Sequence, residues 1–222
     1  TDLIIRLSDT LPKMTENDLV CNVHGVRAEF LAIGKAVKPW ERDRGVYFLG
    51  KALYTKGYRE LIDAMEMHRQ DSLNSRTESN LFRTGDKLPH IDTYGSGPEF
   101  EAIVREIRDK NLPIEPRPGL DHAHPSIHRY NVFVNPSTSD VLCTATAEAL
   151  AMGKHVIIPD HPSNTFFKQF KNTMMYQDAR EVVPLIRKAL ELPPAPLSNI
   201  ETYILSWEAA SERLLDAAAL PA

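Results

Sequence analysis

The segment VYFLGKALYTKG, residues 46–57, decides the fold of this 222-residue chain. Its first four residues form an apolar run that Gly50 ends, a pattern typical of a strand buried in a parallel sheet. A helix is predicted directly afterwards, over residues 58–68, because Leu61, Ile62 and Met65 share one helical face. A buried strand followed at once by such a helix is the repeating unit of an α/β domain.

The same alternation continues toward the C-terminus. Strand-like runs recur at residues 90–94, 131–134, 155–158 and 173–176. Helices are predicted at 100–107, in a segment ending at 153, and at 165–170 and 181–190. A Pro-rich link precedes residue 131, and no strand is predicted within it. Strands that alternate with helices predict a doubly wound, Rossmann-like parallel sheet.

Two segments fall outside this alternation. Residues 69–87 are mostly polar and are predicted to form a surface insertion. Residues 192–222 begin with a stiff Pro-rich linker and continue into a helix with Trp207, Ala210 and Leu214 on one face. The domain between them and the N-terminal segment is predicted to span residues 27–191.

Composition excludes several classes of protein. The chain has 26 basic and 30 acidic side chains, a net charge of −4, so no nucleic-acid partner is predicted. Two cysteines without a CxxC pair exclude a disulfide scaffold and favour a reducing compartment. No apolar stretch is long enough to span a membrane. The chain opens in a strand-like run without Met, which indicates a fragment of a longer protein.

Two predicted loops at the carboxyl ends of strands, where open parallel sheets bind ligands, carry unusual residues. In the first, Lys51 and Lys56 lie between Gly50 and Gly57 beside a helix N-terminus, a combination that suits a diphosphate. The alternative is that both are ordinary surface lysines. The second loop, residues 94–98, reads Tyr-Gly-Ser-Gly-Pro and either cradles a ligand or merely connects two elements.

A third segment, VLCTATAEALAMG at residues 141–153, contains one charged side chain, Glu148. A carboxylate on a buried helix needs a partner, so Glu148 either accepts hydrogen bonds from sugar hydroxyls or pairs with an arginine or a backbone N–H. Asp140 stands eight residues earlier, just before this helix. Cys143 is predicted to be a buried packing residue.

A metal site is the competing interpretation. His124 and His128 have the spacing of one helical turn, and Asp121 and His122 adjoin them. Pro125 interrupts this stretch, and no general base in an HExxH setting accompanies it. The sequence therefore predicts neither a metal site nor a metal hydrolase.

Together these motifs resemble the donor half of the retaining GT-B glycosyltransferases of family 4. That family commonly reads G-R-x4-K-G, then G-x-G-P, then E-x7-E followed by A-x-x-x-G. Here Lys51 replaces the arginine and Asp140 replaces the first glutamate. Longer strings narrow the resemblance to a galactolipid-forming branch, namely CNVHGV (21–26), KGYRELID (56–63), DVLCTATAEALAMGK (140–154), HPSN (161–164) and SWEAA (206–210).

This resemblance implies transfer of galactose from UDP-galactose to a galactolipid acceptor, at a membrane surface and without a metal cofactor. It implies a peripheral protein of the chloroplast outer envelope, in which residues 1–26 are the remnant of an N-terminal acceptor domain. Glu148 would hold the donor ribose, Asp140 would lie near the transferred sugar, and Lys51 and Lys56 would bind the diphosphate. The further donor-binding residues would be Gly50, Gly57, Gly95, Ser96, Gly97, Leu142, Cys143 and Thr144, with His161, Ser163 and Asn164 as candidates for the sugar pocket.

Two other functions stay open on the sequence. One is a family-4 transferase with a different sugar or acceptor. The other is a nucleotide-binding module without catalytic activity. Transfer activity distinguishes the second from the first.

Overall fold

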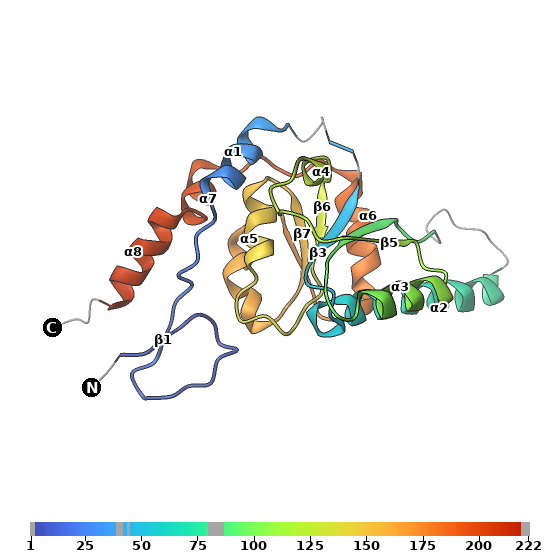
Figure 1. Ribbon diagram of the computed structural model, residues 1–222, viewed down its shortest axis with the longest axis horizontal. Coiled ribbons are helices and arrows are strands. Elements are labelled where there is room, and N and C mark those ends of the chain that lie inside the picture. Colours follow the sequence, from blue (N-terminus) through green and yellow to red (C-terminus); the bar gives the residue numbers. More distant parts are fainter. Residues whose placement is uncertain (1–2, 39–41, 44, 80–86, 219–222) are drawn as a thin grey trace.

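Six parallel strands form the central sheet of the computed structural model, which describes residues 3–38, 42–43, 45–79 and 87–218. In spatial order they are β5 (Ile114–Arg117), β4 (Ile91–Tyr94), β3 (Val46–Leu49), β6 (Val132–Val134), β7 (His155–Pro159) and β8 (Thr173–Tyr176). Counted from β3, this is the order 3-2-1-4-5-6 of the doubly wound fold, with helices on both faces (Figure 1). The predicted fold class is confirmed.

Each face of the sheet has its own hydrophobic core. One core packs against α2 (Tyr58–Ser79), α3 (Phe100–Asp109) and α6 (Val182–Glu191). The other packs against α1 (Ala28–Ala36), α5 (Thr144–Ala151) and the 3-10 helix η4 (Pro162–Gln169). Alternate side chains of β3 enter the two cores, because successive residues of a strand point to opposite faces.

Shorter elements complete the described chain. The N-terminal segment contributes a two-stranded parallel pair, β1 (Ile5–Arg6) with β2 (Leu19–Val20). The remaining elements are η2 (Tyr54–Lys56), α4 (Pro125–His128), η5 (Ala179–Glu181), α7 (Asn199–Ile204) and α8 (Trp207–Ala218). On α8, Ala210 is buried, whereas Trp207 and Leu214 of the predicted face are about half exposed.

The edge strand β5 was not predicted from the sequence. It lies in the Pro-rich link and carries Pro116 in its middle. Proline cannot donate a hydrogen bond to a neighbouring strand, and it therefore weakens a strand prediction. The structure accommodates Pro116 because β5 pairs on one side only, with β4.

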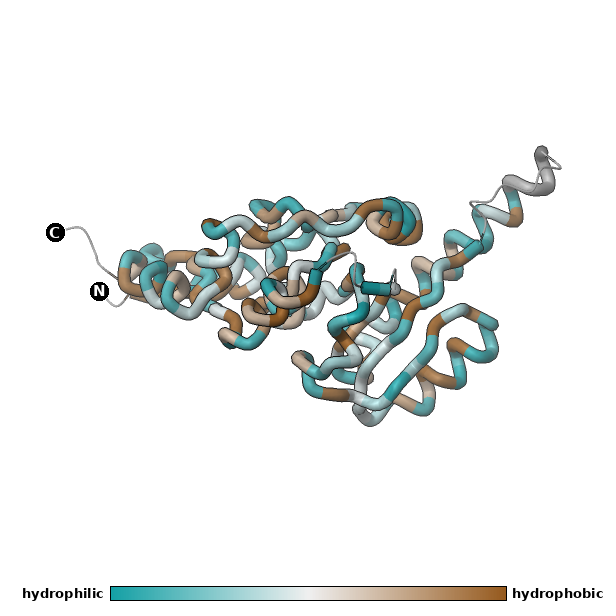
Figure 2. Tube along the Cα trace, turned by 90° about the horizontal axis from the view of Figure 1, so that it is seen from above, coloured by the Kyte–Doolittle hydropathy of each residue, from teal (hydrophilic) through white to brown (hydrophobic). Residues whose placement is uncertain are grey.

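Helix α2 is longer than predicted. It begins at Tyr58 as expected but continues to Ser79, so residues 69–79 of the predicted insertion are helical. Figure 2 shows this part of α2 extending away from the rest of the molecule, which explains why it needs few apolar residues. Residues 80–86 of the predicted insertion lie outside the described residues.

The loops after β3 and β4 lie against each other. The Gly50 N–H donates to Tyr94 O at 3.0 Å, and the Ala52 N–H donates to Ser96 O at 3.1 Å. A Cβ atom on Gly95 would lie 2.2 Å from Gly50 O, closer than any side chain allows. Gly95 is therefore required for the close approach of two loops that reach the carboxyl edge of the sheet.

We expect Gly95→Ala to lower the free energy of unfolding by about 1–3 kcal/mol, because the added methyl group forces the two backbones apart. Gly119→Ala is the matched control, since a Cβ there would lie 3.1 Å from Ser96 Oγ and 3.2 Å from Ser96 N, distances that small shifts relieve. Urea denaturation of both variants measures the difference. Equal stability of the two variants would contradict the proposed steric requirement.

Candidate functional site

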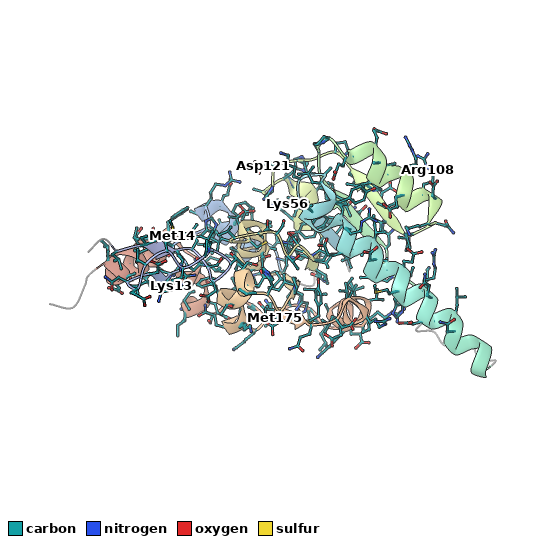
Figure 3. All side chains as sticks on the ribbon, turned by 90° about the horizontal axis from the view of Figure 1, so that it is seen from below. Lys13, Met14, Lys56, Arg108, Asp121 and Met175 are labelled. Carbon is teal, nitrogen blue, oxygen red and sulfur yellow. The ribbon has the colours of Figure 1, made fainter. Side chains whose placement is uncertain are left out.

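A cavity of about 370 Å³ opens at the carboxyl ends of the strands, where β3 and β6 lie side by side. Loops after β3, β4, β5 and β6 line it, and we call it the main cavity. Figure 3 labels one residue from each of two of these loops, Lys56 after β3 and Asp121 after β5. The predicted donor-binding residues that line the main cavity are Gly50, Lys51, Lys56, Gly95, Ser96, Asp140, Leu142, Cys143 and Thr144.

Three residues of the predicted donor set do not line the main cavity. Gly57 ends η2 with a φ of 104°, a left-handed conformation that favours glycine. Gly97 packs so closely that a Cβ atom would lie 2.6 Å from Ala52 O. These two glycines shape the loops around the cavity, whereas the third residue, Glu148, lies behind the cavity wall.

The two lysines differ in their surroundings. Lys51 is exposed, and within the described part of the chain it forms no ion pair. The Lys56 ammonium lies 2.8 Å from an oxygen of Asp140, and both side chains are partly buried. The pair joins the first and third predicted loops, so Lys56 and Asp140 neutralise each other while Lys51 remains available to an anion.

Helix α5 points its N-terminus at the main cavity. Cys143 is the N-cap residue, no side chain caps the helix, and Thr144 and Ala145 line the cavity. The N–H groups of a first helical turn lack partners within the helix and carry partial positive charge. Burial raises the pKa of Cys143 to about 11, so the thiol stays protonated and packs as predicted.

Glu148 lies one turn further along α5, and its partner is a histidine. Its Oε2 atom is 2.5 Å from Nδ1 of His122, which comes from the loop after β5. The sequence had suggested an arginine or a backbone N–H as the alternative to a ligand. His24 is also near, and burial lowers the pKa of His24 while the Glu148 charge opposes this effect.

The histidines have separate structural roles. His124 is the N-cap of α4 and accepts a hydrogen bond from the Ser126 N–H, and Nε2 of His128 lies 2.8 Å from Ala123 O. No group of three or more His, Cys, Asp or Glu side chains suited to a metal occurs among the described residues. Each of these histidines therefore holds a loop or a side chain in place.

The sugar-pocket candidates lie beside the main cavity. Ser163 lines a second cavity of about 190 Å³, and Leu142 lies between the two because it lines both. His161 caps η4, and its Nδ1 atom lies 2.8 Å from Ser163 Oγ. Asn164 is buried, with an unpartnered Oδ1 atom and with Nδ2 donating to Pro159 O.

Sequence reasoning missed several residues of the main cavity. These are Gly119, Leu120 and Asn135, together with His122, which the sequence offered only as a possible metal ligand. Asn135 directly follows β6, so the rule that ligands bind at carboxyl strand ends was sufficient to find it. Gly119, Leu120 and His122 follow β5, the strand that Pro116 concealed.

The fold is that of the GT-B glycosyltransferases. The structure of Anabaena Alr3699/HepE in complex with UDP matches 98% of this chain and 63% of that chain, at a TM-score of 0.64 and 12% identity. The pneumococcal O-GlcNAc transferase GtfA, in complex with UDP and GlcNAc, matches 97% of this chain and 44% of that chain, at a TM-score of 0.61 and 13% identity. No family model matches the chain.

Proteins similar in sequence indicate a narrower family than the fold does. The chain is 42% identical to digalactosyldiacylglycerol synthase 1 of Arabidopsis thaliana, over 97% of the chain and 26% of that protein. It is 40% identical to digalactosyldiacylglycerol synthase 2 of Lotus japonicus, over 98% of the chain and 45% of that protein. The resemblance is confirmed: over nearly its whole length, the chain is homologous to part of the digalactosyldiacylglycerol synthases. It spans a quarter to just under half the length of these relatives.

The lysine pair yields a prediction about binding of a nucleoside diphosphate. Lys51→Ala removes one charge-assisted contact and is expected to weaken UDP binding by roughly tenfold or more. Lys56→Ala should cost more, because it also leaves the Asp140 carboxylate without its partner. Adding Asp140→Asn to Lys56→Ala should recover part of the loss.

Isothermal titration with UDP and with uridine measures these effects, and uridine binding should hardly change. Lys188→Ala, on an exposed lysine of α6, is the control. Equal UDP affinity in all variants would identify Lys51 and Lys56 as ordinary surface lysines.

Glu148→Gln keeps the side-chain shape and an oxygen that accepts a hydrogen bond from His122, but it removes the charge. We expect the free energy of unfolding to fall by less than about 1 kcal/mol. The melting temperature should therefore change by less than about 4 °C. UDP affinity should fall at the same time. A variant that melts much earlier yet binds UDP normally would show that Glu148 serves only the stability of the fold.

Proposed function

We propose that the chain is the donor-binding part of a retaining galactosyltransferase, which transfers galactose from UDP-galactose to monogalactosyldiacylglycerol. The observation that carries this proposal is the main cavity, where Lys51, Lys56 and the N-terminus of α5 converge at the switch point of the sheet. Such an arrangement suits a diphosphate. The homology to digalactosyldiacylglycerol synthases supports the choice of sugar and acceptor.

In the proposed reaction, an acceptor hydroxyl oxygen forms a bond to the anomeric carbon, and the bond from that carbon to the β-phosphate oxygen breaks. The electron pair leaves with UDP, and the hydroxyl proton passes to a phosphate oxygen. Negative charge therefore develops on the diphosphate, where fixed cations and helix N–H groups lower the barrier. Lys51 and Lys56 are assigned to this charge, and Asp140 is placed beside the transferred sugar.

We also propose that the reaction is independent of a metal, and we propose where in the cell the protein lies. We assign neutralisation of the diphosphate to protein groups, so no divalent metal is required. The relatives are named chloroplastic, and we propose a peripheral position on the outer envelope of the chloroplast. Among the described helices, none has the length and apolar character needed to cross a membrane.

Titration calorimetry tests the donor site directly. The chain should bind UDP and UDP-galactose in the presence of EDTA, with ADP as the matched nucleotide control that binds more weakly. Absence of UDP binding would contradict the donor site. Loss of binding in EDTA with recovery in Mn²⁺ would contradict the metal-independent assignment.

A transfer assay tests the whole reaction. The chain alone should transfer no galactose, because the acceptor site is assigned to the N-terminal half of the protein. A fusion to the remaining part of a homologous synthase should transfer labelled galactose from UDP-galactose to monogalactosyldiacylglycerol. A fusion that binds UDP but transfers nothing would favour a nucleotide-binding module, and transfer of another sugar would favour a different transferase of this family.

A further inference from the structure

His122 separates Glu148 from the main cavity. The His122 ring lines that cavity and is 38% exposed, whereas the Glu148 side chain is 16% exposed. Glu148 lines a recess of about 10 Å³, which Leu49, His122 and Ala145 share with the main cavity. A nucleotide in the main cavity therefore meets the imidazole of His122 as well as, and before, the carboxylate behind it.

The hydrogen bond between the two side chains indicates which tautomer a neutral His122 ring adopts. A carboxylate only accepts hydrogen bonds, so Nδ1 of His122 donates to Glu148 Oε2 across the 2.5 Å between them. In a neutral imidazole the other nitrogen, Nε2, is then an acceptor. Among the described residues, no group forms a hydrogen bond with Nε2 of His122 or with Oε1 of Glu148. The pair thus presents two free acceptors, a ring nitrogen and a carboxylate oxygen.

Two adjacent acceptors match two adjacent hydroxyl donors. The ribose of a nucleoside diphosphate carries such a pair, at its 2′ and 3′ positions. The phosphates are attached to the 5′ position of the same ribose. The same cavity contains the lysines assigned to those phosphates. The His122 ring lines the main cavity and Glu148 does not, so Nε2 of His122 is the acceptor nearer to a ribose in that cavity.

We propose that His122 is a ribose-recognition residue: its Nε2 accepts a hydrogen bond from one ribose hydroxyl while Oε1 of Glu148 accepts one from the other. This inference rests on the proposed function, because it requires a uridine nucleotide in the main cavity. It assigns to the pair a role that the family resemblance gives to Glu148 alone. His122 also positions Glu148, and the two roles are separable by experiment.

The test compares UDP with 2′,3′-dideoxy-UDP by titration calorimetry on the 222-residue chain. The unaltered chain should bind UDP about tenfold or more tightly than the dideoxy probe. His122→Ala should weaken UDP binding by about tenfold and leave binding of the dideoxy probe unchanged. His124→Ala is the matched control, because His124 lies in the same loop but does not line the cavity.

His122→Asn separates recognition from positioning. The Asn amide keeps a donor near the position of Nδ1 and lacks a group at the position of Nε2. If His122 contacts the ribose, the Asn variant binds UDP as weakly as the Ala variant does. Recovery of full UDP affinity by His122→Asn would overturn the proposal and leave His122 as a positioning residue.

Three other results would overturn the proposal. They are equal binding of both probes by the unaltered chain, equal weakening of both probes in the His122 variants, and unchanged UDP affinity in those variants. Failure of the unaltered chain to bind UDP at all would overturn the proposed function itself. This result differs from the three above, in which the unaltered chain still binds UDP. If His122→Ala does not fold, the two-probe comparison with His122→Asn decides the question.

Discussion

Parallel pairing of β3 with both β4 and β6 is the constraint on which the rest of the structure depends. Val46 pairs with Ile91 on one side and with Val132 on the other. All strands of this sheet run the same way, so the loops that follow them emerge at one edge. The chain leaves β3 toward one side and returns to β6 on the other, which opens a crevice at the centre of that edge. The main cavity occupies this crevice.

Buried polar contacts hold the scaffold beneath the cavity. Burial acts to raise the pKa of Asp92 on β4, but the hydrogen bonds that it accepts from Tyr130 and Arg117 bring this pKa below its usual value. Tyr130 also contacts the hydroxyl of Tyr94, a residue of the cavity wall. Fully buried Lys154 donates to two backbone oxygens near the end of α4, and burial lowers its pKa well below the usual range. The contacts of Asp92 join neighbouring strands, and those of Lys154 hold the segment at the end of α4. The two partners of Lys154, Ile127 and Tyr130, do not line the main cavity.

The two carboxylates near the cavity each have a side-chain partner. Lys56 forms an ion pair with Asp140, and Nδ1 of His122 donates a hydrogen bond to Glu148. An isolated carboxylate at this depth would be poorly solvated and would repel a diphosphate. Each pair joins two loops that lie far apart in the sequence, and this links the shape of the cavity to its charge.

The sequence by itself determined the doubly wound sheet and most residues of the cavity, because strand and helix periodicity and glycine-lysine loops are local patterns. It also carried the family resemblance that the relatives confirm. Tertiary structure alone decided that β5 forms an edge strand despite Pro116, since tolerance of proline depends on which side of a strand is paired. It alone decided the partner of Glu148, because His122 comes within 2.5 Å only when the loop after β5 folds over α5. A contact between residues 26 positions apart on different elements leaves no periodic signal in the chain.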